Sequence, residues 1–163
     1  DEPESLADLG ADTEVFSLIP GRFFINLEDR EANGSVSESE YEAVREQLVD
    51  DLTALTGPDG GSVCADVYLG EDVFDGPAAD IAPDVVAVPA DGFDLKAGFS
   101  GSKPVFGAGP RNGMHKFSNA TLVTDDDRIV VDDVDLYDLT PTLLDLLEVD
   151  VDADFDGRSL VRA

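Results

Sequence analysis

Cysteine, histidine and long apolar runs are nearly absent from this 163-residue chain. Cys64 is the single cysteine, which excludes an intrachain disulfide and a cysteine-based metal cluster. It lies in an apolar run, Val63-Cys64-Ala65-Asp66-Val67, where a small buried core residue is the expected role. No apolar run approaches 18 residues and no basic, apolar leader is present, so we expect a soluble chain that does not enter a membrane.

Positive charge is scarce as well. Ten Lys and Arg residues stand against 37 Asp and Glu residues, which gives a net charge of -27. Such a surface repels nucleic acid and anionic membranes, because binding to either needs basic side chains. The same repulsion should destabilise the fold at low salt and be tolerated at molar salt, where the screening length is about 3 Å. The composition therefore predicts the high-salt cytoplasm of a halophile.

An acidic calcium-binding or disordered segment is the alternative interpretation of this charge. No run has the loop pattern of a calcium site, with glycine at its sixth position and glutamate at its twelfth. Apolar periodicity continues to the end of the chain, and 42% of the residues are hydrophobic. A globular protein is therefore the expectation.

Apolar spacing predicts two helices. Ser37 and Glu40 have the spacing of a capping box, which indicates that the first helix begins at Ser37. This helix, near residues 38–55, should end at Gly57-Pro58, since glycine suits a left-handed cap and proline cannot continue a helix. The second helix, near residues 140–148, should have Thr140 as its N-cap and Pro141 at its first position. The predicted buried faces consist of Tyr41, Val44, Leu48, Leu52 and Leu55, and of Leu143, Leu144, Leu146 and Leu147.

Short apolar runs bounded by Gly, Pro or Asp predict strands. These runs are residues 15–19, 22–27, 63–69, 83–89, 120–124 and 128–131. Strands interleaved with helices indicate an α/β class, with a small mixed sheet packed by the two helices in a single domain over residues 1–163. Asp84, beside Pro83, is assigned a turn or cap role before its strand rather than a metal-ligand role.

The only histidine, His115, follows the glycine-rich segment 98–113. Neutral imidazole is a common transition-metal ligand, but one histidine does not make a site. Its partners must be carboxylates of this chain or residues on a part of the protein that is absent. The chain starts at Asp1 without a methionine, and we expect it to be a piece of a longer protein.

Several stretches resemble a known superfamily in the same order. Residues 138–147 and 154–160 resemble the closing signature of the alkaline phosphatase superfamily, which includes sulfatases, phosphomutases and phosphodiesterases. Other stretches resemble its type I phosphodiesterase/nucleotide pyrophosphatase branch: residues 20–27, Arg30-Glu31, Gly34, residues 82–85 and Gly113-Met114-His115. The resemblance spans roughly residues 15–161 but covers only the C-terminal half of such an enzyme.

The resemblance implies an alkaline-phosphatase-like fold, of which this chain is the C-terminal portion. It also implies hydrolysis of a small phosphate ester by two divalent metals, zinc or sometimes manganese, with a Thr or Ser nucleophile that is transiently phosphorylated. His115 corresponds to the last metal ligand, in a Gly-x-His motif. The nucleophile and the other ligands belong to the N-terminal half, so we expect no catalytic residue and no activity in this chain alone.

Arg111 and Asn112 flank the motif and are candidates for contacting a substrate phosphate, Arg111 through two parallel hydrogen bonds. Pairing of Arg111 with a surface carboxylate is an equally good alternative. Two other functions stay open: a sulfatase or phosphomutase of the same superfamily, and a non-catalytic acidic interaction domain in which His115 has no role. The expected partner is the N-terminal half of the same protein, with neither nucleic acid nor membrane.

Overall fold

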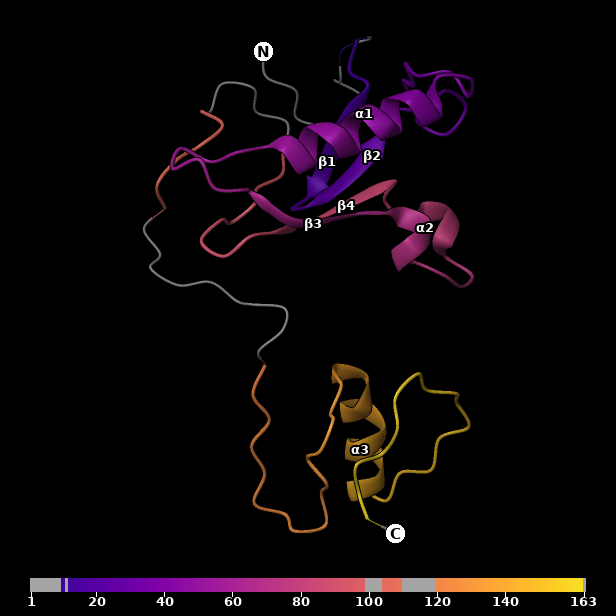
Figure 1. Cartoon of the computed structure of the whole chain (residues 1–163). Helices are drawn as coiled ribbons and strands as arrows, with labels where there is room; N and C mark the ends of the chain where they lie inside the picture. The colour runs from indigo at the N-terminus through magenta and orange to yellow at the C-terminus, as the bar shows by residue number, and fades with distance from the viewer. Residues whose placement is uncertain (1–9, 11, 99–103, 110–119, 163) are drawn as a thin grey trace. The chain divides into compact units, whose positions relative to one another are not determined.

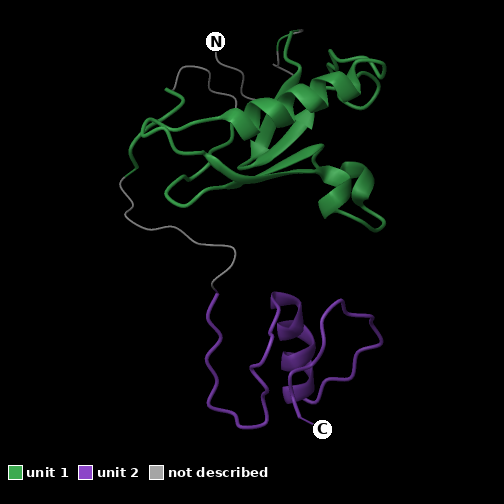
Figure 2. Cartoon of the chain, viewed as in Figure 1, with its two compact units in different colours: residues 1–115 green, residues 116–163 purple. Residues whose placement is uncertain are grey.

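The computed structural model describes residues 10, 12–98, 104–109 and 120–162 (Figure 1). The chain divides into two compact units, residues 1–115 and residues 116–163 (Figure 2). The first unit contains a four-stranded sheet with one long helix, and the second contains a shorter helix. The single domain predicted over residues 1–163 stays a prediction.

The sheet is the centre of the first unit. Its strands are β1 (Val15–Ile19), β2 (Arg22–Ile25), β3 (Cys64–Leu69) and β4 (Val85–Pro89), in the order β1-β2-β4-β3. Every pairing in it is antiparallel, so the prediction of mixed strand directions is wrong for this sheet. Gly21 makes the tight turn from β1 to β2 with φ +71°, and a Cβ there would lie 2.4 Å from the Ala87 carbonyl oxygen.

Helix α1 (Tyr41–Ala54) packs on one face of this sheet, against β2, β3 and β4 (Figure 1). Alternate residues of a strand face the same side, so Val85 and Ala87 of β4 both point toward the helix. They form the buried core with Leu52, Val63 and Cys64. Cys64 is a buried free thiol, and its predicted role as a small core residue is confirmed.

The start of α1 differs from the prediction. Residues 38–40 form a turn, and the helix begins at Tyr41, with Glu40 rather than Ser37 as its N-cap. The Glu40 carboxylate accepts a hydrogen bond from the Ser37 backbone N–H, which is half of the predicted capping box. The other half is absent because the Ser37 hydroxyl donates to this same carboxylate instead of accepting from a backbone N–H.

The end of α1 also comes early. Leu55 is already extended, with ψ 120°, so Gly57 is not the left-handed cap that we predicted. The reason is pairing further along the chain: the Val63 N–H donates to the Leu55 carbonyl, and Thr56 forms a bridge with Ser62. This short turn leads directly into β3. The connection from β3 to β4 contains one helical turn, α2 (Gly70–Val73), and the 3-10 turn η2 (Ala79–Ile81).

The second unit is built around η3 (Leu136–Asp138) and α3 (Leu139–Leu146). The N-cap of α3 is Asp138, so Thr140 is not the cap and Pro141 lies at the third helical position. Proline is tolerated there because the first N–H groups of a helix have no partner within it. The helix starts earlier than predicted because Asp135 and Asp138 form a capping box around η3, which continues into α3.

The predicted leucine face of α3 is only partly correct. Leu143 is 58% exposed and Leu147 69% exposed, whereas the buried side chain of this helix is Thr142. Residues 120–126 form no strand, and residues 128–131 contribute only an isolated bridge between Ile129 and Val161. A strand needs a neighbour for its backbone groups, and among residues 120–162 only the C-terminal segment supplies one.

The combination of a sheet with helices places the chain in a mixed α/β class. The alkaline-phosphatase-like fold stays a prediction. Among the described residues, no helix has both the length and the apolar character needed to cross a bilayer.

Candidate functional site

The three residues predicted to form the site lie outside the described residues. Arg111, Asn112 and His115 all belong to residues 110–119. Within residues 10, 12–98, 104–109 and 120–162, no group of three or more His, Cys, Asp or Glu side chains is arranged to hold a metal ion. The described part of the chain contains a buried polar cluster in each unit, around Asp84 and around Asp138.

The first cluster surrounds Asp84, immediately before β4. Its carboxylate is buried and accepts two parallel hydrogen bonds from the Arg30 guanidinium, at 2.8 and 2.7 Å. It also accepts hydrogen bonds from the Tyr41 hydroxyl and from the Ile25 backbone N–H, both at 2.6 Å. Asp84 thus joins β2, the loop after it and the start of α1. The predicted turn or cap role of Asp84 describes only its position before β4. Its hydrogen bonds reach residues far away in the sequence, from Ile25 to Tyr41.

The loop that carries Arg30 is held at its other side by Asn26. This buried side chain donates hydrogen bonds to the carbonyl oxygens of Thr13 and Asn33, at 2.8 and 3.0 Å. The Asn26 carbonyl accepts from the backbone N–H groups of Ser35 and Val36. The loop is thereby fixed at both ends, which places the Arg30 guanidinium against Asp84.

The donors around Asp84 control its ionisation. Burial by itself would raise the pKa of Asp84, but the hydrogen bonds from Arg30, Tyr41 and Ile25, with the charge of Arg30, hold that pKa below its usual value. The hydrogen bond to Asp84 raises the pKa of Arg30 in turn. Burial, and then the hydrogen bond to the Asp84 carboxylate, raise the pKa of Tyr41 to about 12. Each oxygen of the Asp84 carboxylate accepts two hydrogen bonds, so the cluster is an internal ion pair and leaves no lone pair directed at a cation.

The raised pKa of Tyr41 gives a first prediction. Because the folded pKa lies above the ordinary value near 10, the Tyr41 contribution to stability is complete below pH 10 and is lost as the pH rises toward 12. We expect an ultraviolet titration of tyrosinate to contain one phenol that ionises near pH 12 in the folded protein. The Tyr41→Phe variant should lack that step, and a titration unchanged by this substitution would contradict the assignment.

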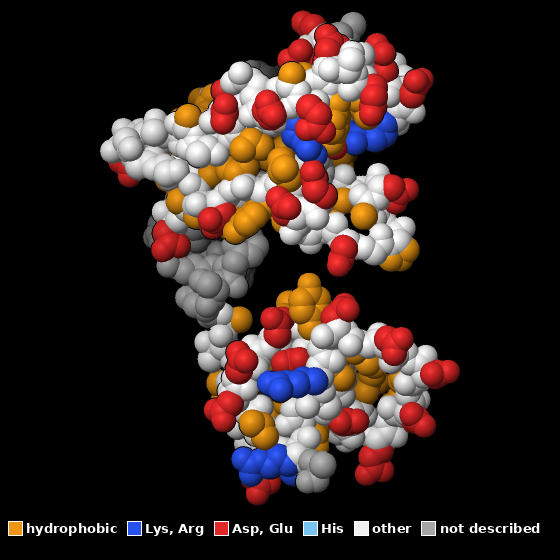
Figure 3. Space-filling model, turned by 45° about the vertical axis from the view of Figure 1, so that its right-hand side comes forward, with side chains coloured by type: hydrophobic (Ala, Val, Ile, Leu, Met, Phe, Trp, Pro, Cys, Tyr) orange, Lys and Arg blue, Asp and Glu red, His pale blue; other side chains and the backbone are white. Residues whose placement is uncertain are grey.

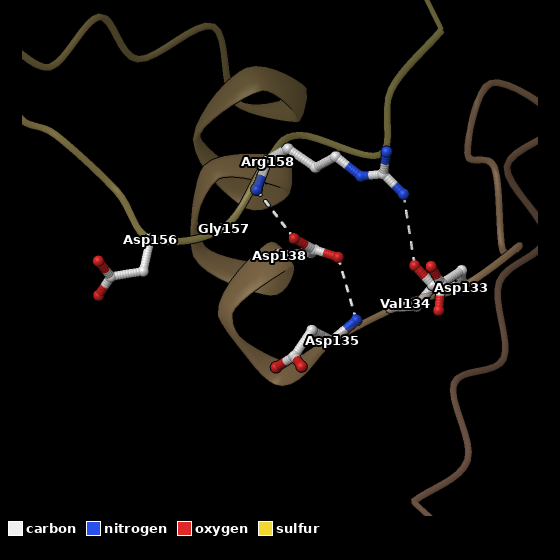
Figure 4. Close-up of a pocket in the computed structure, with 7 residues that line it drawn as sticks. All are labelled: Asp133, Val134, Asp135, Asp138, Asp156, Gly157 and Arg158. Atoms are coloured by element: carbon white, nitrogen blue, oxygen red, sulfur yellow. Dashed lines mark hydrogen bonds between the residues drawn. The ribbon is translucent and has the colours of Figure 1, made fainter. Parts of the chain in front are cut away.

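The second cluster, in the second unit, surrounds Asp138 and Thr142. One carboxylate oxygen of Asp138 accepts from the Arg158 backbone N–H at 2.8 Å, and the other accepts from the Asp135 N–H at 3.0 Å (Figure 4). These two backbone hydrogen bonds hold the pKa of Asp138 below its usual value. The Thr142 hydroxyl donates to the Asp138 carbonyl and accepts from the Leu160 N–H at 2.9 Å. The C-terminal segment is therefore attached to α3 by two side chains of the helix start.

Gly157 is required for this attachment. A Cβ at this position would lie 2.3 Å from the carbonyl carbon and oxygen of Tyr137 and 2.6 Å from the Asp138 nitrogen. Any other residue would push the segment away from η3 before Arg158 could reach Asp138. The Arg158 guanidinium donates to the Asp133 backbone carbonyl at 3.4 Å (Figure 4).

A shallow pocket lies beside this cluster, between η3 and the C-terminal segment (Figure 4). Its lining is Asp133, Val134, Asp135, Asp138, Asp156, Gly157 and Arg158. The Asp138 carboxylate is already occupied by backbone N–H groups, so it has a structural role here. The acidic run at residues 125–127 is likewise local, since Asp126 pairs with Arg128 at 2.6 Å.

The buried hydroxyl of Thr142 gives a second prediction. Thr142→Val keeps the shape of the side chain but leaves the buried Leu160 N–H without its acceptor, which costs about 1–3 kcal/mol. We expect hydrogen exchange at the Leu160 amide to accelerate by about tenfold or more. Thr140→Val, an exposed position in the same helix, is the matched control and should leave this rate unchanged. Equal rates in both variants would show that Thr142 does not hold the segment.

No protein-family model matches the chain, and no match to it was found among curated proteins or solved structures. The resemblance to the alkaline phosphatase superfamily therefore rests on the residues themselves.

Proposed function

We propose that this chain is the C-terminal part of a metal-dependent phosphoric ester hydrolase of the phosphodiesterase/nucleotide pyrophosphatase type. His115 is the last ligand of a site for two divalent metals, zinc or manganese. The nucleophile and the remaining ligands come from the N-terminal half of the same protein, which is the partner of this chain. Arg111 and Asn112 lie beside the substrate phosphate, and the enzyme works in a high-salt cytoplasm.

The observation that carries the proposal is the ordered series of stretches that ends in Gly113-Met114-His115 and the C-terminal signature. Hydrogen bonds connect several of these stretches within each unit. Arg30 meets both Asp84 and the strand residue Ile25 in the first unit, and residues 138–142 hold residues 158–160 in the second.

His115 is the single histidine of the sequence, and imidazole suits zinc. When bound in the intact enzyme, two metals hold the attacking and leaving oxygens of the phosphate ester and lower the pKa of the nucleophile. The role of this chain is to place one nitrogen ligand and, through Arg111, a positive charge near the phosphate oxygens.

The test uses the parent protein that includes the N-terminal half. His115→Ala should remove at least one of two bound zinc ions and lower hydrolysis of a chromogenic phosphodiester by about 100-fold or more. Lys116→Ala, the neighbouring substitution, is the control and should retain metal and activity. Metal content, measured by atomic emission, separates loss of a ligand from loss of folding when combined with circular dichroism.

Each outcome of this experiment decides between the functions that the sequence leaves open. Hydrolysis of a sulfate ester but no phosphate ester would replace the proposal with a sulfatase. Absence of both activities and of bound metal would favour the non-catalytic acidic interaction domain. Full metal content and activity in the His115→Ala parent would overturn the role of His115.

A further inference from the structure

We draw no further inference here: the strongest candidate, the exposed apolar surface of Leu136, Leu143 and Leu147 on η3 and α3, carries none because nothing in the described part of the chain shows what covers it.

Discussion

Asp84→Ala is expected to destabilise the first unit by about 3 kcal/mol, because the substitution leaves the Ile25 N–H and the Tyr41 hydroxyl without an acceptor. It also removes the buried carboxylate partner of Arg30, which keeps its more exposed ion pair with Glu31. For a chain of this size, that loss corresponds to a decrease of about 6–12 °C in Tm. Asp84→Asn should be nearly as costly, since its amide group would direct N–H donors at groups that are themselves donors. Thermal unfolding followed by circular dichroism measures both effects.

Glu42→Gln is the matched control for this prediction. Glu42 is 65% exposed and pairs with Arg45, which keeps a second carboxylate partner in Glu71. Removal of such an exposed charge should cost less than about 0.5 kcal/mol. A double-mutant cycle with Arg30→Gln then isolates the Arg30–Asp84 pair. A coupling energy near zero, or equal losses for Asp84 and Glu42, would show that the buried cluster does not stabilise the unit.

Potassium chloride should raise the Tm of the chain by at least about 10 °C between 0.1 M and molar concentrations. The physical cause is screening: the range of repulsion between surface charges falls from about 10 Å to about 3 Å over this interval, and by size scaling 10 °C corresponds to about 3 kcal/mol or more. The repulsion comes from the excess of 37 acidic over 10 basic side chains, a net charge of -27. Figure 3 shows the excess of negative charge: Asp and Glu side chains are spread over the visible face of each unit, with few Lys or Arg side chains between them.

A charge variant distinguishes screening from a general effect of salt on apolar burial, which concentrated salts can also strengthen. Glu46→Lys and Asp50→Lys are suitable because both side chains are exposed on α1. Each change adds two charges, so the double variant has a net charge of -27 + 4 = -23. It should be more stable than the parent chain at 0.1 M and gain less on addition of salt. A Tm that is flat in salt, or a variant with an unchanged salt response, would reject the halophilic interpretation of the composition.

The elements that the sequence predicted well are those governed by local pattern. Residues 41–54 form the first helix because their apolar positions recur at helical spacing, and the run before Pro89 forms a strand because it is apolar and β-branched. Helix ends were less predictable, since they depend on contacts with distant residues. Leu55 leaves α1 to pair with Val63, and Asp138 becomes the N-cap of α3 while it also holds Arg158.

The Asp84 cluster was missed, although the sequence contains a signal for it. An aspartate directly before a strand as apolar as residues 85–88 is expected to be buried, and a buried carboxylate needs donors. Arg30 is one of only ten basic residues in the sequence that could pair with a buried carboxylate. Tyr41 occupies a position of the apolar helix face, and helical spacing gives no information about a partner for its hydroxyl. The geometry around Arg111, Asn112 and His115 stays a prediction, because these residues lie outside the described part of the chain.

The attachment of residues 157–162 to η3 and α3 places these residues under structural constraint. Among the described residues of the second unit, Leu160 is the buried apolar side chain. Its backbone N–H donates to the Thr142 hydroxyl, and its carbonyl accepts from the Val130 N–H. The Arg162 backbone N–H donates a hydrogen bond to the Arg128 carbonyl. A nonsense mutation that ends the chain at position 157 would therefore delete these structural contacts.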